Sequence, residues 1–248
     1  MADKIVFLVR AMLTLWLLTV GSLLMLVSAI LTGFQAPRLY RETIGANLGR
    51  LALRILGIDM RVLGPVPDGS RQVVYVSNHT STLDVFALIS LGLPNTRFFL
   101  SGFLRKLLPM GLIGYLIGNF WTVPQSFPEK RRIIFMNAER VLRRTGESVY
   151  LSPEGERIVT GEIGHFNKGS FHLATMLRAP IVPIYIRIPR EINPGKGLHS
   201  RPGTIEVFFR EPVETASWRV EDLEHNRDRV RELFVDWHDQ LRTPEAAQ

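Results

Sequence analysis

The chain has 248 residues and no cysteine, so thiol nucleophiles, disulfides and zinc-thiolate sites are excluded. This length suits one sizeable α/β domain with an appendage. The formal net charge of +7 favours a polyanionic partner, which can be nucleic acid, an anionic membrane surface or a phosphorylated substrate. Because the sequence contains no recognised nucleic-acid-binding motif, we expect no nucleic acid partner.

The first predicted element is a long apolar segment near the N-terminus. Residues 11–35 contain no charged residue, and they exceed the roughly 20 apolar residues that cross a bilayer. A cleaved signal peptide would have a shorter apolar region followed by a small-residue cleavage site. We therefore expect this segment to insert into a membrane, either by spanning it or by entering from one side.

Basic residues flank this segment on both sides, namely Lys4 and Arg10 before it and Arg38, Arg41, Arg50 and Arg54 after it. By the positive-inside rule, the C-terminal bulk of the chain is expected on the cytoplasmic face of the membrane. Residues 38–58 repeat apolar side chains at helical intervals, interrupted by arginine. This stretch predicts a basic amphipathic helix lying on the membrane, or alternatively a helix packed on the domain core. We expect an N-terminal membrane region at 1–60 and a folded domain at 61–248.

From residue 70 onward, strand and helix patterns alternate. Short apolar runs predict strands at 73–77, 97–101, 120–124, 148–152, 181–188 and 204–209. Helical patterns lie at 82–92, 129–146, 165–178 and 220–242, and a glycine-bearing apolar segment covers 103–119. In the last helix, one face carries Val230, Leu233, Phe234 and Trp237. This alternation predicts an α/β fold, a layered domain whose largely parallel sheet is flanked by helices.

The first motif with chemical content is Ser-Asn-His-Thr-Ser-Thr-Leu-Asp, directly after a predicted strand. Open α/β sheets place their sites beyond the carboxyl ends of the strands. A helix beginning near Ser81 or Thr82 puts Asp84 in its first turn, where its carboxylate can reach back to His79. One ring nitrogen then stays free as a base. The chain has no Gly-x-Ser-x-Gly motif, so the pair suits activation of a substrate hydroxyl. The same residue types also cap ordinary strand-to-helix turns.

Two further motifs follow later strands. In Ser-Pro-Glu-Gly-Glu-Arg, Pro153 and Gly155 favour a tight turn, and Arg157 offers a planar fork for phosphate or carboxylate oxygens. In Phe-Asn-Lys-Gly, Lys168 and Gly169 open a helix whose first amides, together with the lysine, can bind an anion. A surface loop with a Glu–Arg pair and simple helix initiation are the alternative interpretations.

Taken together, the motifs and their order resemble the glycerophospholipid acyltransferases of the 1-acylglycerol-3-phosphate acyltransferase type. The resemblance covers about residues 70–215. The matching residues are Asn78, His79, Ser81 and Asp84 in the first block, Pro153, Glu154, Gly155 and Arg157 in the third, Phe166, Lys168 and Gly169 in the next with one inserted residue, and Ile181–Ile184 in the last. An N-terminal hydrophobic segment is also usual in this family.

The resemblance implies a membrane-bound O-acyltransferase of phospholipid biosynthesis, with an acyltransferase domain at 61–248. His79 would take the proton of an acceptor hydroxyl as that oxygen attacks an acyl thioester, and Asp84 would orient His79. The remaining residues expected to bind substrate are Asn78, Ser81, Glu154, Gly155, Arg157, Lys168 and Gly169, with Arg157 holding phosphate.

The partners implied by the resemblance are membrane lipids, a lysophospholipid acceptor and a thioester donor. The acceptor is 1-acylglycerol-3-phosphate or a related lysolipid, and the donor is acyl-CoA or acyl carrier protein. No cofactor and no metal are expected. The fatty chain is expected in a groove lined by the apolar segment 103–121, with a place in the protein core as the equal alternative for this segment.

The chain departs from the family pattern in two places. Val123 and Pro124 stand where the second block usually has an acidic residue and an arginine, and Glu156 stands where the third block has threonine. Both differences are expected to weaken binding of a doubly charged phosphate monoester, so a lysolipid with a diester head group is an alternative acceptor. Arg131 and Arg132 lie close in sequence and can compensate.

Two other functions are open from the residues alone. Carboxylate and imidazole groups suit several metals, so a metal-dependent phosphoester hydrolase can be built from His79, Asp84, Glu154 and His165. A non-enzymatic adaptor that binds anionic membranes would explain the charge and the apolar segment, but it leaves the ordered motifs unexplained.

Overall fold

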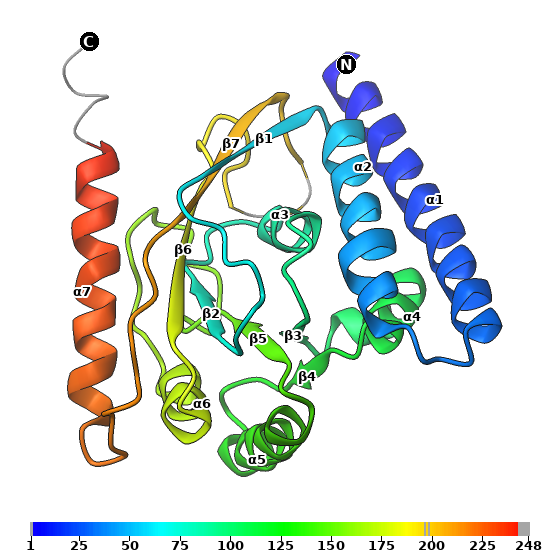
Figure 1. Ribbon diagram of the computed structural model, residues 1–248. Coiled ribbons are helices and arrows are strands. Elements are labelled where there is room, and N and C mark those ends of the chain that lie inside the picture. Colours follow the sequence, from blue (N-terminus) through cyan, green and yellow to red (C-terminus); the bar gives the residue numbers. More distant parts are fainter. Residues whose placement is uncertain (1, 196, 198, 243–248) are drawn as a thin grey trace.

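A mostly parallel sheet forms the centre of the structure (Figure 1). The computed structural model describes residues 2–195, 197 and 199–242, and within these residues seven strands form the sheet. In spatial order they are β1 (Ile58–Leu63), β7 (Gly203–Phe209), β6 (Ile181–Arg187), β2 (Val74–Ser77), β5 (Ser148–Leu151), β3 (Thr96–Ser101) and β4 (Phe120–Thr122). Neighbouring strands run parallel, except that β6 and β7 are antiparallel. The predicted α/β fold is confirmed.

Parts of the two predicted regions, 1–60 and 61–248, lie outside the described residues. These parts are Met1, Lys196, Leu198 and residues 243–248.

Helices cover both faces of the sheet. One face carries α5 (Pro128–Thr145), α6 (Gly169–Leu177) and α7 (Leu223–Arg242). The other face carries α3 (Asp84–Ser90) and, outside it, α2 (Ala46–Leu56) and α1 (Ala2–Leu31). The remaining helical segments are a π-helical segment at Leu39–Gly45, a 3-10 turn at Leu104–Lys106 and α4 (Leu108–Leu116), which contacts α1.

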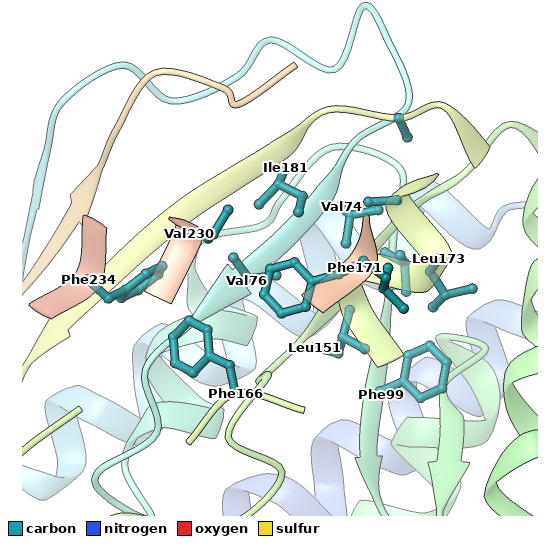
Figure 2. Close-up of a cluster of buried hydrophobic side chains, with 14 of the residues drawn as sticks. Val74, Val76, Phe99, Leu151, Phe166, Phe171, Leu173, Ile181, Val230 and Phe234 are labelled. Carbon is teal, nitrogen blue, oxygen red and sulfur yellow. The ribbon is translucent and has the colours of Figure 1, made fainter. Parts of the chain in front are cut away.

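The core beneath α5, α6 and α7 shows how the strand pattern divides residues between the two faces (Figure 2). Because side chains alternate along a strand, Val74 and Val76 of β2 point into this core, whereas Tyr75 belongs to the cluster on the opposite face. The helices contribute large apolar side chains to it, including Phe171, Leu173, Val230 and Phe234. On α7, the predicted apolar face is buried at Val230, Phe234 and Trp237, and Leu233 is half-buried.

The amphipathic stretch 38–58 packs against the domain, the second of the two predicted alternatives. A Cβ on Gly49 of α2 would lie 2.9 Å from the backbone nitrogen of Ser90 at the end of α3, so the two helices are in close backbone contact. The helix ends at Leu56, before the position predicted for it, because Gly57 adopts a left-handed φ of 79° that terminates helices. Strand β1 follows at once and crosses the predicted boundary at residue 60; its mostly exposed side chains give only a weak strand pattern.

Arg41, one of the arginines used to predict membrane orientation, lies in the protein interior. Its Nη1 is 2.6 Å from Glu147 Oε1, its Nε donates to the carbonyl of Ile117, and Arg97 binds the other oxygen of Glu147 at 2.6 Å. Burial raises the pKa of Glu147, but hydrogen bonds and charge from Arg97 and Arg41 outweigh it and hold this pKa below its ordinary value. This network ties the N-terminal helices to the start of β5, so Arg41 does not face a membrane surface.

Helix α1 presents a long uncovered apolar face. Among the described residues, one helix, at 4–31, is long and apolar enough to cross a membrane. Its inner side is buried at Leu18, Met25 and Ala29. The exposed large side chains are Ile5, Val6, Leu8, Val9, Met12, Leu13, Leu15, Trp16, Leu23, Leu24, Val27, Ile30 and Leu31. Such a face is suited to lipid, and membrane insertion stays a prediction.

Candidate active site

The motif-bearing loops meet at one edge of the sheet. Because β2, β5, β3 and β4 run parallel, their carboxyl ends lie at the same edge, where α/β folds place their sites. The loop after β2 carries His79, and the loop after β5 carries Ser152 and Arg157. These three residues line one cavity of about 320 Å³.

His79 and Asp84 form the predicted pair. His79 Nδ1 lies 2.7 Å from Asp84 Oδ2, and Asp84 is 1% exposed in the first turn of α3. The same oxygen accepts the backbone N–H groups of Thr80 at 2.9 Å and Ser81 at 3.0 Å. Because an ionised carboxylate only accepts hydrogen bonds, the imidazole proton resides on Nδ1 and Nε2 keeps a lone pair. Asp84 therefore closes the turn and also orients the imidazole of His79, whose role as a base stays a prediction.

The carboxyl group of Glu154 is hydrogen-bonded to the backbone of His79. Its Oε2 accepts the backbone N–H of His79 at 2.5 Å, its Oε1 accepts that of Gly164 at 2.8 Å, and the residue is 2% exposed. Burial raises the pKa of Glu154 to about 7, against the two backbone hydrogen bonds that lower it. This carboxyl was expected to bind substrate, and the structure places it where it holds the main chain of His79.

Asn78 and Ser81 make buried hydrogen bonds that fix the ends of the His79 loop. Asn78 exchanges two hydrogen bonds with the backbone of Ile186 at the end of β6, at 2.8 and 2.9 Å. The Ser81 hydroxyl donates to Asn193 Oδ1 at 2.9 Å and accepts the N–H of Leu83 at 3.0 Å. Both predicted substrate-binding side chains are thus engaged within the protein.

The cavity beside His79 is lined by both polar and apolar side chains. The polar lining includes His79, Ser152, Arg131 and Arg157. The apolar wall consists of Val85, Leu88, Ile89, Phe98, Phe99, Leu100, Phe103, Leu104, Phe135 and Leu151. Of the segment 103–121 that was expected to line the fatty-chain groove, only Phe103 and Leu104 are among the described lining residues, because α3 and β3 supply most of the wall.

Arg157 reaches the cavity over the beginning of α3. Its Nη1 donates to the hydroxyl of Thr82 and lies 3.4 Å from the carbonyl of Gly195. Gly155 permits the turn that brings it there: its φ is 72°, and a Cβ would lie 2.9 Å from Asn167 Nδ2 and 3.0 Å from Gln125 Nε2. A side chain at this position would therefore be strained.

Lys168 and Gly169 lie outside this cavity wall. As predicted, they open a helix, α6. The ammonium of Lys168 pairs with the carboxylate of Glu224 on the exposed surface, and a Cβ on Gly169 would lie 2.6 Å from the ring of Phe135. This motif therefore packs α6 against its neighbours, whereas the other two motifs meet at the cavity.

Arg131 belongs to the cavity although the family pattern does not point to it. It projects from α5, its Nη1 donates to the carbonyl of Val123 at 2.9 Å, and it is among the residues that line the cavity. Its neighbour Arg132 pairs with Glu129 at 3.1 Å on the exposed side of the helix. Because Arg131 and Arg132 are consecutive on a helix, their side chains lie on different sides of α5. The amphipathic pattern of residues 129–146 already predicts this division.

The four residues considered for a metal-dependent hydrolase are not brought together. His79, Asp84 and Glu154 are neighbours, but His165 is exposed. Within residues 2–195, 197 and 199–242, no group of three His, Asp or Glu side chains is arranged to hold a metal ion.

Comparison with known proteins identifies the family. The chain is 27% identical over 194 residues to a 1-acyl-sn-glycerol-3-phosphate acyltransferase of Cocos nucifera, covering 77% of this chain and 62% of that protein. The human 1-acyl-sn-glycerol-3-phosphate acyltransferase beta is 32% identical over 157 residues, which cover 62% of this chain and 55% of that protein. The chain thus spans less than two thirds of the length of these relatives.

The fold is shared with a solved structure. The crystal structure of PlsC, the 1-acyl-sn-glycerophosphate acyltransferase of Thermotoga maritima, superposes with a TM-score of 0.79 at 21% identity, covering 97% of this chain and 98% of that one. A family model described as Acyltransferase matches residues 58–187, which is more than half of the chain. The resemblance inferred from the motifs is confirmed: the chain belongs to the acyltransferase family.

Proposed function

We propose that this protein is a membrane-bound enzyme that transfers a fatty acyl group from a thioester to the free hydroxyl of 1-acylglycerol-3-phosphate. The observation that carries the proposal is the His79–Asp84 pair, joined at 2.7 Å and opening onto a cavity with an apolar wall and two arginines. The pair supplies a base for a hydroxyl, the wall suits a fatty chain, and the arginines suit a phosphate.

In the proposed reaction His79 is the general base. Its Nε2 accepts the hydroxyl proton of the acceptor as the oxygen attacks the thioester carbonyl, and Asp84 stabilises the imidazolium that forms. Collapse of the tetrahedral adduct breaks the carbon–sulfur bond. The imidazolium then returns the proton to the departing thiolate, so the products are an ester and a free thiol.

The acceptor assignment rests on Arg157 and on the relatives, all of which are named for 1-acylglycerol-3-phosphate. A guanidinium presents a planar fork that matches phosphate oxygens. Acyl-CoA and acyl carrier protein carry the same thioester, so both are candidate donors for this site.

The membrane location rests on α1. The helix at 4–31 leaves an apolar face uncovered, and insertion of that face into a bilayer would remove it from water. Apart from the buried Arg41, the basic residues that flank the helix support a catalytic domain on the cytoplasmic face.

The proposal is tested by assaying the purified full chain in lipid vesicles. Each donor is supplied with 1-acylglycerol-3-phosphate, with diester lysophospholipids or with glycerol 3-phosphate. We expect formation of the diacyl phosphate with at least one donor, unaffected by EDTA. Transfer to diester acceptors alone would refute the acceptor assignment. Loss of activity with EDTA, accompanied by phosphate release, would instead support a metal-dependent hydrolase.

A further inference from the structure

Arg131 is a cation that lines the cavity and has no carboxylate partner among the described residues. Among the described residues, its side chain has one hydrogen-bond acceptor, the carbonyl of Val123, and lies 6.0 Å from the ring centre of Phe135. A guanidinium carries five N–H donors, so most of them have no hydrogen-bond acceptor among the described residues. Burial also lowers the pKa of Arg131, which reflects the cost of holding this charge away from water.

A second polar group that lines this cavity lacks a hydrogen-bond partner among the described residues. The Ser152 hydroxyl is buried and has no hydrogen bond within the described residues, although it lines the cavity together with Arg131. Buried polar groups are normally satisfied by protein, water or ligand. A donor and a cation that share one small cavity fit an anionic ligand rich in acceptor oxygens.

The loop that leads into α5 lies directly over the turn that positions Arg157. Gln125 Nε2 lies 3.0 Å from the position that a Cβ on Gly155 would take. Arg131 is tied to the same loop through Val123. The two arginines therefore enter the cavity from different segments, one from α5 and one from the loop after β5.

We propose that Arg131 is a specificity-determining residue that, together with Arg157, binds the phosphate monoester of the acceptor. This assignment rests on the proposed function and names the group that selects its acceptor. A monoester carries up to two charges and three terminal oxygens, which can engage both forks, whereas a diester carries one charge and two terminal oxygens. The second family block usually has an acidic residue and an arginine where this chain has Val123 and Pro124. Arg131 of α5 thus supplies the cation that is missing there.

The test compares Arg131→Gln and Arg131→Lys with the matched control Arg132→Gln. The readouts are kcat/KM for 1-acylglycerol-3-phosphate and for a diester lysophospholipid, and KM for the acyl donor. We expect Arg131→Gln to lower kcat/KM for the monoester roughly 10- to 100-fold, the range for a lost charge-assisted hydrogen bond. The loss for the diester should be much smaller, and the donor KM and the control should be unchanged.

The lysine variant keeps the inference testable if the glutamine variant fails to fold. Arg131→Lys preserves the charge but not the fork, so it should lose part of the monoester preference. Equal losses for monoester and diester would show a packing role and overturn the inference. Unchanged monoester kinetics in both variants would overturn it as well.

A binding measurement separates this inference from the proposed function. Calorimetric titration of 1-acylglycerol-3-phosphate into the His79→Ala protein, with and without Arg131→Gln, does not depend on turnover. Weaker binding in the double variant would support the phosphate site even if the wild type transferred no acyl group. Equal binding by the two proteins, with an active wild type, would leave the function standing and remove Arg131 from the site.

Discussion

Replacing Asp84 with asparagine tests how the buried carboxylate supports the base. Asp84 Oδ2 accepts three hydrogen bonds, from the ring of His79 and from the backbone of Thr80 and Ser81, whereas Oδ1 is buried without a partner among the described residues. An asparagine that preserves the three bonds must point its NH2 group into the place of Oδ1. That leaves a buried donor unsatisfied, at a cost of about 1–3 kcal/mol.

The catalytic loss should exceed this structural cost. With either orientation of the asparagine amide, the negative charge that stabilises the imidazolium is gone. If the NH2 group takes the place of Oδ2, it also faces the ring N–H of His79 and the backbone N–H groups of Thr80 and Ser81. We expect kcat to fall by about 10²–10⁴-fold, the usual worth of general-base catalysis, which corresponds to about 3–5 kcal/mol in the barrier.

The assay measures initial rates of acyl transfer together with thermal unfolding. Asp59→Asn, which removes an exposed carboxylate on β1, is the matched control and should change neither. The reasoning would be refuted by an Asp84→Asn protein that is folded at the assay temperature and keeps a kcat close to that of the wild type.

Three further predictions concern stability and placement of the site. Between the ordinary carboxyl pKa and about 7, folded Glu154 holds a proton that the unfolded chain has released, so its contribution to stability falls as pH rises through this window. Denaturant titrations give the free energy of unfolding of wild type and of Glu154→Gln. The free energy of the wild type relative to the variant should fall by about 2 kcal/mol from pH 5 to pH 8; a constant difference would contradict this. Glu147→Ala leaves the buried Arg41 and the half-buried Arg97 without their carboxylate and should cost about 3–5 kcal/mol in the same titrations. Gly49→Leu should separate α2 from α3 and reduce both thermal stability and acyl transfer, and normal values of both would show that this contact is dispensable.

The layered fold and the contact between His79 and Asp84 were predictable because their signals are local. Each strand except β1 is a short apolar run, and the helices of the domain follow their own periodic patterns. His79 and Asp84 are five residues apart within one turn, so the chemistry of that turn alone brings them together. Strand β1 was missed because only Ile58 in it is buried, which leaves little hydrophobic pattern.

The remainder of the site depends on contacts between distant segments. Glu154 binds the backbone of His79 across 75 residues, and nothing in its own loop shows that it turns inward. Lys168 pairs with Glu224, a contact set by where α7 lies. Arg41 shows the same limit, since its charge suggests a membrane surface until Glu147 is seen beside it.

The most direct test of the account is the loss of the base itself. A His79→Gln protein keeps a polar side chain of similar reach but cannot accept a proton at neutral pH. It should be folded, should still bind 1-acylglycerol-3-phosphate, and should form the diacyl product at least about 10²-fold more slowly than the wild type. His225→Gln, at an exposed position on α7, should transfer acyl groups normally. A folded His79→Gln protein with near-normal turnover would contradict the assignment of His79 as the general base.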